Sequence, residues 1–280
     1  MPYTAEISRK NPTCFLFLVD QSGSMLKPFG GEASKAKAQG VADAINRLLQ
    51  NLVLKCAKSE GIRDYFHVGV IGYGGSKVAP AFGGTLANRK LVPISEVGHN
   101  PLRLEERIRK VDDGAGGLIE QKYKFPVWIE PTGSGKTPMC QAFQLALATL
   151  REFIQQYPNG YPPLLFNITD GAATDGNPEP AAAAVKNLKT TDGNVLVFNA
   201  HLSSRPHHAI EFPDKEDVLP DDYSKMLFRM SSLLPERIQA AAANEGFKTS
   251  DATRGFVYNA DLVAVIRFME IGTKVASSVR

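Results

Sequence analysis

The feature that most constrains the fold is an unbroken apolar run near the start of the chain. The run Cys14 to Val19 contains six residues without a polar side chain. Such a run is typical of a strand that is buried on both faces. Asp20, Ser22 and Ser24 follow it directly and fall into the turn at its end. The pattern therefore predicts a covered sheet with a group of polar side chains at the end of one strand.

The rest of the chain alternates between strand and helix signals, as expected for a parallel sheet with helices on both faces. We expect the further strands at Phe66 to Tyr73, Leu164 to Thr169, Val195 to Ala200 and Phe256 to Tyr258. The pattern loosens between residues 74 and 131, where we expect a loop-rich insertion. Within it, Val78 to Phe82 and Leu91 to Ile94 are expected to form an edge hairpin, followed by a short helix from Leu102 to Val111.

Composition favours one globular domain over residues 1–280 and excludes some classes of partner. The net charge is only +3, and the basic residues are scattered among acidic ones, so nothing indicates nucleic acid or an anionic membrane. The start, Met1 to Pro12, lacks the apolar core of a signal peptide, and no run approaches the ~20 apolar residues of a membrane span. We therefore expect a cytoplasmic protein whose three cysteines are reduced and structural.

Asp20, Ser22 and Ser24 form an Asp-x-Ser-x-Ser pattern of hard oxygen donors. Alternate residues in an extended segment point the same way, so the carboxylate and the two hydroxyls can converge on one cation. Oxygen ligands favour Mg²⁺, with Mn²⁺ or Ca²⁺ as the other candidates. The alternative is an ordinary turn in which Asp20 caps a helix.

Two later positions supply donors of the same kind. Thr137 precedes Pro138 at the expected start of a helix, where it should act as the helix cap. Asp170 follows the expected strand Leu164 to Thr169. A hydroxyl and a carboxylate therefore stand at the two ends of one helix-strand unit.

With these five residues the chain resembles the von Willebrand factor A (VWA) family and its metal-ion-dependent adhesion site. The resemblance implies a doubly wound α/β fold with a mostly parallel six-stranded sheet in the order 3-2-1-4-5-6, an antiparallel edge strand and helices on both faces. It also implies that Ser22, Ser24 and Thr137 bind the metal directly, while Asp20 and Asp170 act largely through water. A protein partner would then supply an Asp or Glu carboxylate to the open position.

The resemblance favours a non-enzymatic, Mg²⁺-dependent protein-interaction module, an adaptor or regulatory subunit in a bacterial stress-response or defence system. The chain is similar to cytosolic VWA proteins of the tellurite-resistance-associated type, whose family context includes kinases, phosphatases and ATPases. The similarity to this subgroup lies in the segment Arg254 to Asp261. Two alternatives remain. One is a metal-dependent hydrolase or phosphotransfer enzyme that uses Asp20 and Asp170. The other is a self-assembling structural subunit that places its own carboxylate in a neighbour's site.

Other signals point to less specific roles. The segment Gly133 to Thr137 looks like the end of a phosphate-binding loop, but Glu130 stands where that motif requires glycine. His201, His207 and His208 are expected to be surface residues rather than metal ligands. Asp175 is expected to lie in a simple turn.

Overall fold

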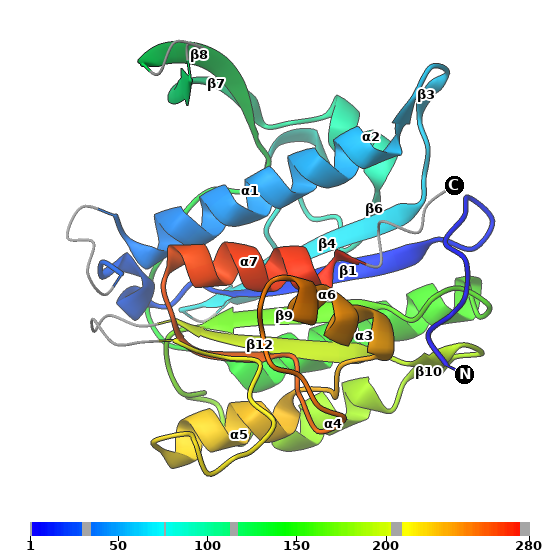
Figure 1. Ribbon diagram of the computed structural model, residues 1–280, viewed down its shortest axis with the longest axis vertical. Helices are drawn as coiled ribbons and strands as arrows, with labels where there is room; N and C mark the ends of the chain where they lie inside the picture. The colour runs from blue at the N-terminus through cyan, green and yellow to red at the C-terminus, as the bar shows by residue number, and fades with distance from the viewer. Residues whose placement is uncertain (1, 30–34, 76, 113–116, 203–208, 275–280) are drawn as a thin grey trace.

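The computed structural model describes residues 2–29, 35–75, 77–112, 117–202 and 209–274. A central sheet runs through the molecule, with helices on both faces (Figure 1). Its parallel strands are β1 (Thr13–Asp20), β4 (Phe66–Gly74), β9 (Leu164–Thr169), β12 (Leu196–Leu202) and β14 (Phe256–Ala260). None of the helices in the described ranges is long and apolar enough to cross a membrane.

Short antiparallel strands extend the sheet at its margins. The strand order is β13-β14-β12-β9-β1-β4-β5, and β6 also pairs with β4. The added strands are β5 (Lys77–Pro80), β6 (Val92–Pro93) and β13 (Ile210–Glu211). The expected hairpin between residues 78–82 and 91–94 was wrong, because β5 and β6 each pair with β4.

The expected six-stranded, doubly wound sheet was also wrong. Over the described residues the sheet has eight strands of both orientations, and three two-stranded sheets lie apart from it. These are β2 (Ala57–Lys58) with β3 (Gly61–Ile62), β10 (Lys189–Thr190) with β11 (Gly193–Asn194), and β7 with β8. Two-residue strands are too short to show a period-2 pattern, so sequence periodicity could not predict them.

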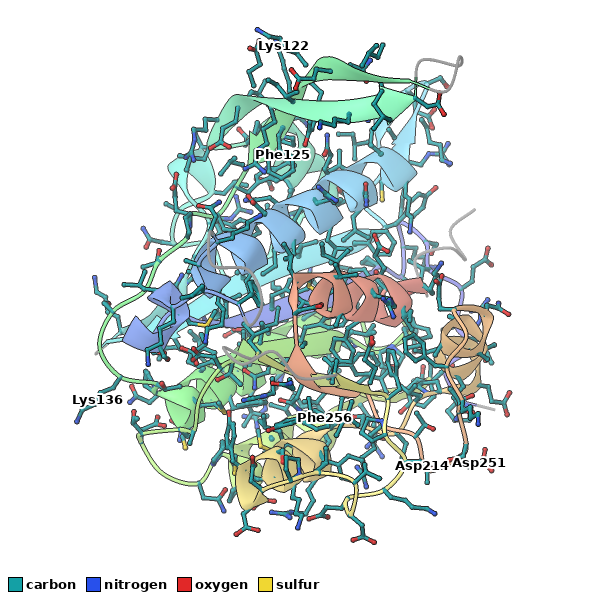
Figure 2. The ribbon with its side chains drawn as sticks, turned by 60° about the vertical axis from the view of Figure 1, so that its left-hand side comes forward. Lys122, Phe125, Lys136, Asp214, Asp251 and Phe256 are labelled. Carbon is teal, nitrogen blue, oxygen red and sulfur yellow. The ribbon has the colours of Figure 1, made fainter. Side chains whose placement is uncertain are left out.

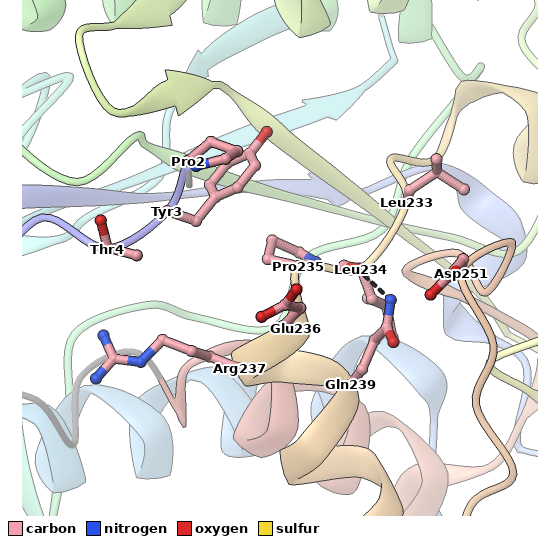
Figure 3. A pocket seen from close by; sticks show the side chains of 10 residues that line it. All are labelled: Pro2, Tyr3, Thr4, Leu233, Leu234, Pro235, Glu236, Arg237, Gln239 and Asp251. Atoms are coloured by element: carbon pink, nitrogen blue, oxygen red, sulfur yellow. Dashed lines mark hydrogen bonds between the residues drawn. The ribbon is translucent and has the colours of Figure 1, made fainter.

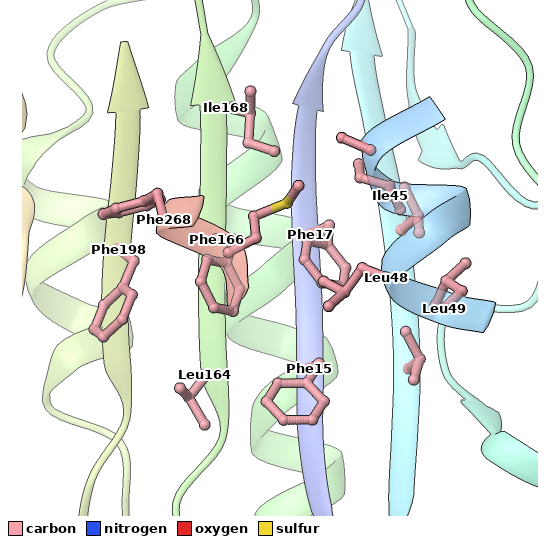
Figure 4. Close-up of a cluster of buried hydrophobic side chains, with 14 of the residues drawn as sticks. Phe15, Phe17, Ile45, Leu48, Leu49, Leu164, Phe166, Ile168, Phe198 and Phe268 are labelled. Atoms are coloured by element: carbon pink, nitrogen blue, oxygen red, sulfur yellow. The ribbon is translucent and has the colours of Figure 1, made fainter. Parts of the chain in front are cut away.

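Each face of the sheet has its own buried core, because the residues of β1 alternate between the two faces. Phe15 and Phe17 pack on the face covered by α1 (Lys37–Cys56), α6 (Glu236–Asn244) and α7 (Leu262–Gly272). Figure 4 shows Phe17 and Phe166 side by side on this face, opposite Ile45, Leu48 and Leu49 of α1. Leu16 and Leu18 pack on the other face, under α3 (Met139–Gln156), α4 (Glu179–Lys186) and α5 (Asp222–Met230).

A long two-stranded ribbon projects from the body beyond α1 (Figure 1). It consists of β7 (Arg103–Asp112) and β8 (Leu118–Val127), paired in antiparallel register from Arg103↔Val127 to Asp112↔Leu118. The short helix expected from Leu102 to Val111 was therefore wrong. Its apolar residues Leu104, Ile108 and Val111 stand at helical spacing, but β7 pairs with β8 along its whole length, so the segment satisfies its hydrogen bonds as a strand. The helix α2 (Ile94–His99) and the 3-10 turns η1 (Gly23–Leu26) and η2 (Gly84–Leu86) complete the connections.

Candidate functional site

The candidate site lies at the carboxyl ends of β1 and β9. These strands are parallel neighbours, with Val19 opposite Ile168. Asp20 and the pair Thr169 and Asp170 therefore reach the same edge of the sheet. Ligands commonly bind at the carboxyl ends of strands in sheets of this kind.

Asp20 is fully buried, and both of its carboxylate oxygens are engaged. Its Oδ1 accepts a hydrogen bond from the backbone N–H of Ser22 (2.8 Å), and its Oδ2 accepts one from the Thr169 hydroxyl (2.7 Å). Burial raises the pKa of Asp20 above its usual value, and the hydrogen bonds from Ser22 and Thr169 oppose that shift. Asp20, the last residue of β1, thus fixes the turn that follows the strand.

Ser22, Ser24 and Asp170 form a chain of hydrogen bonds beside Asp20. The hydroxyls of Ser22 and Ser24 lie 2.9 Å apart, and the Ser24 hydroxyl donates to Asp170 Oδ1 at 2.6 Å. The second carboxylate oxygen of Asp170 is 2.7 Å from Lys37 Nζ, in an ion pair whose side chains are 3% and 1% exposed. Sequence reasoning missed Lys37, because a lysine at the start of an amphipathic helix is normally solvated and gives no signal of burial.

Thr137 lies in a loop that packs against the turn after β1. The Ser134 N–H donates to the Gln21 carbonyl (2.7 Å), and the Gly23 N–H donates to the Gly135 carbonyl (3.2 Å). Gly135 has a φ of +60°, and a Cβ there would lie 2.5 Å from Gly75 Cα, so this close approach requires glycine. Thr137 itself is 6% exposed; its backbone N–H donates to the Thr174 hydroxyl (3.0 Å), and its carbonyl accepts from the Thr174 N–H (2.9 Å). It therefore adjoins the Asp20–Asp170 group but lies outside its hydrogen-bond chain.

The start of α3 differs from the expectation for Thr137. The helix begins at Met139, whose N–H donates to the Thr137 carbonyl, and its next two N–H groups are capped by the Asp175 side chain rather than by that of Thr137. The two carboxylate oxygens of Asp175 accept from the N–H groups of Cys140 and Gln141, each at 3.0 Å. Lys136, just before the cap region, is exposed and points away from the body (Figure 2). Asp175 is 35 residues from Cys140 and 34 from Gln141, so local sequence pattern could not reveal this cap.

His201 is half-buried rather than fully exposed, so the expected surface position is met only in part. It belongs to β12, and its ring stacks on Tyr258 with a centroid distance of 4.8 Å. Burial lowers the pKa of His201 to about 4, while the charges of Asp221 and Asp170 act in the opposite direction. His201 is therefore neutral at pH 7. His207 and His208 lie outside the described residues.

The chemistry of the oxygen cluster suits a hard cation. In the described ranges, no group of three or more His, Cys, Asp or Glu side chains is arranged for a metal ion. The five predicted residues instead offer two carboxylates and three hydroxyls, the oxygen donors that Mg²⁺, Mn²⁺ and Ca²⁺ prefer. The donor set therefore fits such an ion, although Lys37 already supplies one positive charge to it.

The β7–β8 ribbon is a second candidate region. Its inner face is tied to α1, since Arg107 pairs with Asp43 at 2.8 Å and stacks 3.7 Å above the Phe125 ring. Its outer face is open: Leu104, Ile108 and Leu118 are 55%, 57% and 69% exposed. Figure 2 shows Phe125 at the base of the ribbon and Lys122 toward its outer side.

A third feature is a cavity of about 310 Å³ beside the first residues of the chain and the start of α6 (Figure 3). It is lined by residues that include Tyr3, Leu234, Arg237 and Asp251. None of the five predicted site residues lines it.

No protein-family model and no curated protein matches the chain. Among solved structures, the PilB minor pilin from Streptococcus sanguinis is similar with a TM-score of 0.50 and 10% identity, over 100% of this chain and 64% of that one. The type V pili tip protein Mfa5 from Porphyromonas gingivalis, represented by three N-terminal domains, has a TM-score of 0.33 and 12% identity over 58% and 20% of the two chains. The pilus adhesin RrgA from Streptococcus pneumoniae has a TM-score of 0.30 and 16% identity over 61% and 22%.

The chain spans less than two-thirds of the length of each of these proteins. At such low identity the likeness concerns the fold alone, and of the three it is the PilB likeness that reaches a TM-score of 0.50.

These findings correct several expectations. The predicted VWA membership is contradicted, because no family model matches and the similar structure with a TM-score of 0.50 is a minor pilin by name. The same likeness contradicts the predicted stress-response adaptor in the cytoplasm, since a minor pilin is by name a component of a pilus. The similar structure with a TM-score of 0.50 is named as a minor pilin and not as an enzyme, in agreement with the expectation that the chain is not an enzyme.

Proposed function

We propose that this protein is a non-enzymatic structural subunit that assembles with neighbouring copies in a surface polymer of the pilus type. The likeness to the PilB minor pilin supports the proposal at the level of fold. The observation that carries it is the β7–β8 ribbon, which projects from the body with an exposed outer face. An isolated two-stranded ribbon is at most marginally stable in water, and a subunit that pairs with it supplies the missing contacts.

The outer face of the ribbon is complementary to itself. Along β7 it carries Glu106, Ile108 and Lys110, all exposed and all on one side because alternate residues share a face. If two ribbons lie antiparallel with their Ile108 side chains together, Glu106 of each copy lies opposite Lys110 of the other. A two-fold symmetric contact needs this kind of self-complementary patch. A second copy of the chain is therefore the partner that this face fits.

The oxygen cluster supplies a second proposed contact. We propose that Asp20, Ser22, Ser24, Thr137 and Asp170 hold Mg²⁺, with Mn²⁺ or Ca²⁺ as substitutes, and that a neighbour's Asp or Glu carboxylate joins them. The hydrogen-bonded group of hydroxyls and carboxylates at the ends of β1 and β9 supports this proposal. Such an ion would supply the positive charge that the neighbour's carboxylate needs, because the neutral hydroxyls of the cluster do not provide it.

Sedimentation velocity over a range of protein concentrations tests the assembly. The wild-type protein should self-associate, and the double variant Leu104→Ser/Ile108→Ser should remain monomeric. The matched control is Val218→Ser/Val263→Ser, which removes two side chains that are 52% and 58% exposed elsewhere on the molecule. A wild-type protein that stays monomeric at all concentrations, with and without Mg²⁺, contradicts the proposed function. Equal association in both double variants would show that the ribbon is not the contact.

Thermal melts test the cation site. An ion that binds only the folded state stabilises it by about 2.7 kcal/mol at 100 times its Kd. Mg²⁺ should therefore raise the melting temperature of the wild type but not that of Ser22→Ala/Ser24→Ala. Ser59→Ala, at an exposed position far from the cluster in sequence, serves as the control. The same rise in the double variant would place the ion elsewhere.

A further inference from the structure

Lys37 brings a positive charge into the oxygen cluster. It is the first residue of α1 and only 2% exposed, and its backbone N–H donates to the Lys27 carbonyl at 3.0 Å. Its Nζ lies 2.7 Å from Asp170 Oδ2. A lysine is rarely buried this deeply unless it is paired, because removal of an ammonium from water is costly.

With Lys37 in place, every carboxylate oxygen of the cluster has a partner. Asp20 accepts from the Ser22 N–H and from the Thr169 hydroxyl. Asp170 accepts from the Ser24 hydroxyl at one oxygen and is paired with Lys37 at the other. One ammonium and two carboxylates leave the cluster with a formal charge of −1 instead of −2.

A divalent cation at this cluster would meet that ammonium. Coulomb repulsion between a divalent and a univalent cation is strong at contact distance, even at the intermediate dielectric of a partly buried site. Both cations also require the same carboxylate, that of Asp170. Occupation by the ion is therefore favoured only after Lys37 Nζ withdraws from Asp170 Oδ2.

We propose that Lys37 is a tethered competitor for the cation site: its ammonium holds Asp170 in the metal-free protein and must leave Oδ2 when a divalent cation binds. This inference rests on the cation site proposed above. It makes Lys37 the residue that sets the affinity of the site. It also favours divalent over monovalent ions, since an ion of single charge gains little over the ammonium that it replaces.

Titration calorimetry with Mg²⁺ tests the competition. Lys37→Met keeps a long unbranched side chain without the charge, and it should bind Mg²⁺ at least about tenfold more tightly than the wild type. In the presence of a chelator, the melting temperature of Lys37→Met should be lower than that of the wild type. On addition of Mg²⁺ it should rise by more than that of the wild type. The control Lys35→Met removes a pair with Asp43 (2.8 Å) outside the cluster, and it should leave the affinity unchanged.

The outcomes separate the competition from the site itself. Equal or weaker Mg²⁺ binding by Lys37→Met overturns the competition but leaves the cation site standing. Absence of Mg²⁺ binding in both wild type and Lys37→Met overturns both. If Lys37→Met does not fold, the side-chain ammonium resonance of Lys37 in the wild type decides: it should shift or be lost to solvent exchange as Mg²⁺ is added, and an unchanged resonance while Mg²⁺ binds overturns the competition.

Discussion

Polar side chains of β4, β9, β12 and α5 gather near the carboxyl edge of the sheet, and their individual hydrogen-bond partners define the chemistry of this edge. The Tyr73 hydroxyl donates to Asn167 Oδ1 at 2.7 Å, and the Tyr223 hydroxyl donates to the Gly171 carbonyl. Burial raises the pKa of both tyrosines, so they remain protonated donors. His201 lies in this group as a neutral ring. An unpaired buried polar group costs about 1–3 kcal/mol, so the pairing of these groups is a condition of the fold.

His201 should make the protein less stable in acid. Its pKa is about 4 when folded, because of burial, and about 6.5 when unfolded. The unfolded state therefore takes up the proton first as pH falls below about 6.5, and up to about 3 kcal/mol of stability is lost by pH 4. Urea unfolding of wild type and His201→Phe between pH 7 and pH 4 measures this. The stability difference between the two proteins should shift in favour of the variant toward acid; parallel curves would show that His201 is not a buried neutral group.

At the scale of elements, the sequence correctly predicted the strands and helices in which the spacing of apolar residues matches the face that is buried. The expected strand Leu164 to Thr169 is β9, and the apolar run Cys14 to Val19 lies within β1. Leu262, Val265, Ile266 and Met269 recur at helical spacing, and they lie in α7. Apolar run length and helical spacing are local signals, and all three elements are covered on the side that their pattern indicates. Pairings such as β5 with β4 depend on distant residues and could not be read in this way.

The candidate site follows the same division. Asp20, Ser22 and Ser24 could be predicted because they are contiguous with a buried strand. The contact of Lys37 with Asp170 joins residues far apart in sequence, and the Asp175 cap of α3 does the same. Neither arrangement leaves a local pattern.

The Asp175 cap tests how far α3 depends on this distant residue. Asp175→Ala leaves the N–H groups of Cys140 and Gln141 without their acceptor and should lower the free energy of unfolding by about 1 kcal/mol. Asp175→Asn keeps one side-chain oxygen and should lose less. Chemical denaturation of the three proteins measures the order. A loss in Asp175→Ala no larger than that in Asp175→Asn would show that the helix start is held by other contacts.

At the scale of the whole molecule, the two cores on either face of the sheet are separate from the outer ribbon. Among the described residues, the buried apolar side chains include none between Val97 and Phe125. The inner half of the ribbon is nevertheless fixed to α1 by Arg107 and Asp43. The body therefore has a complete core without the outer half of the ribbon, residues 109–121. That half is available for contact with another subunit.

A shortened ribbon tests this division directly. Ile108 pairs with Lys122, so residues 109–121 can be replaced by Asn-Gly, a two-residue turn that joins antiparallel strands. The Arg107–Asp43 pair is retained, and no buried core residue is removed. The melting temperature should change by less than about 3 °C, which corresponds to about 1 kcal/mol or less. Self-association in sedimentation velocity should be weakened, because Lys110 and Leu118 are removed from the outer face while Leu104 and Ile108 remain. A large fall in melting temperature, with a monomer that has lost native circular dichroism, would instead make the outer ribbon part of the cooperative fold; full association of a stable shortened protein would move the subunit contact to another surface.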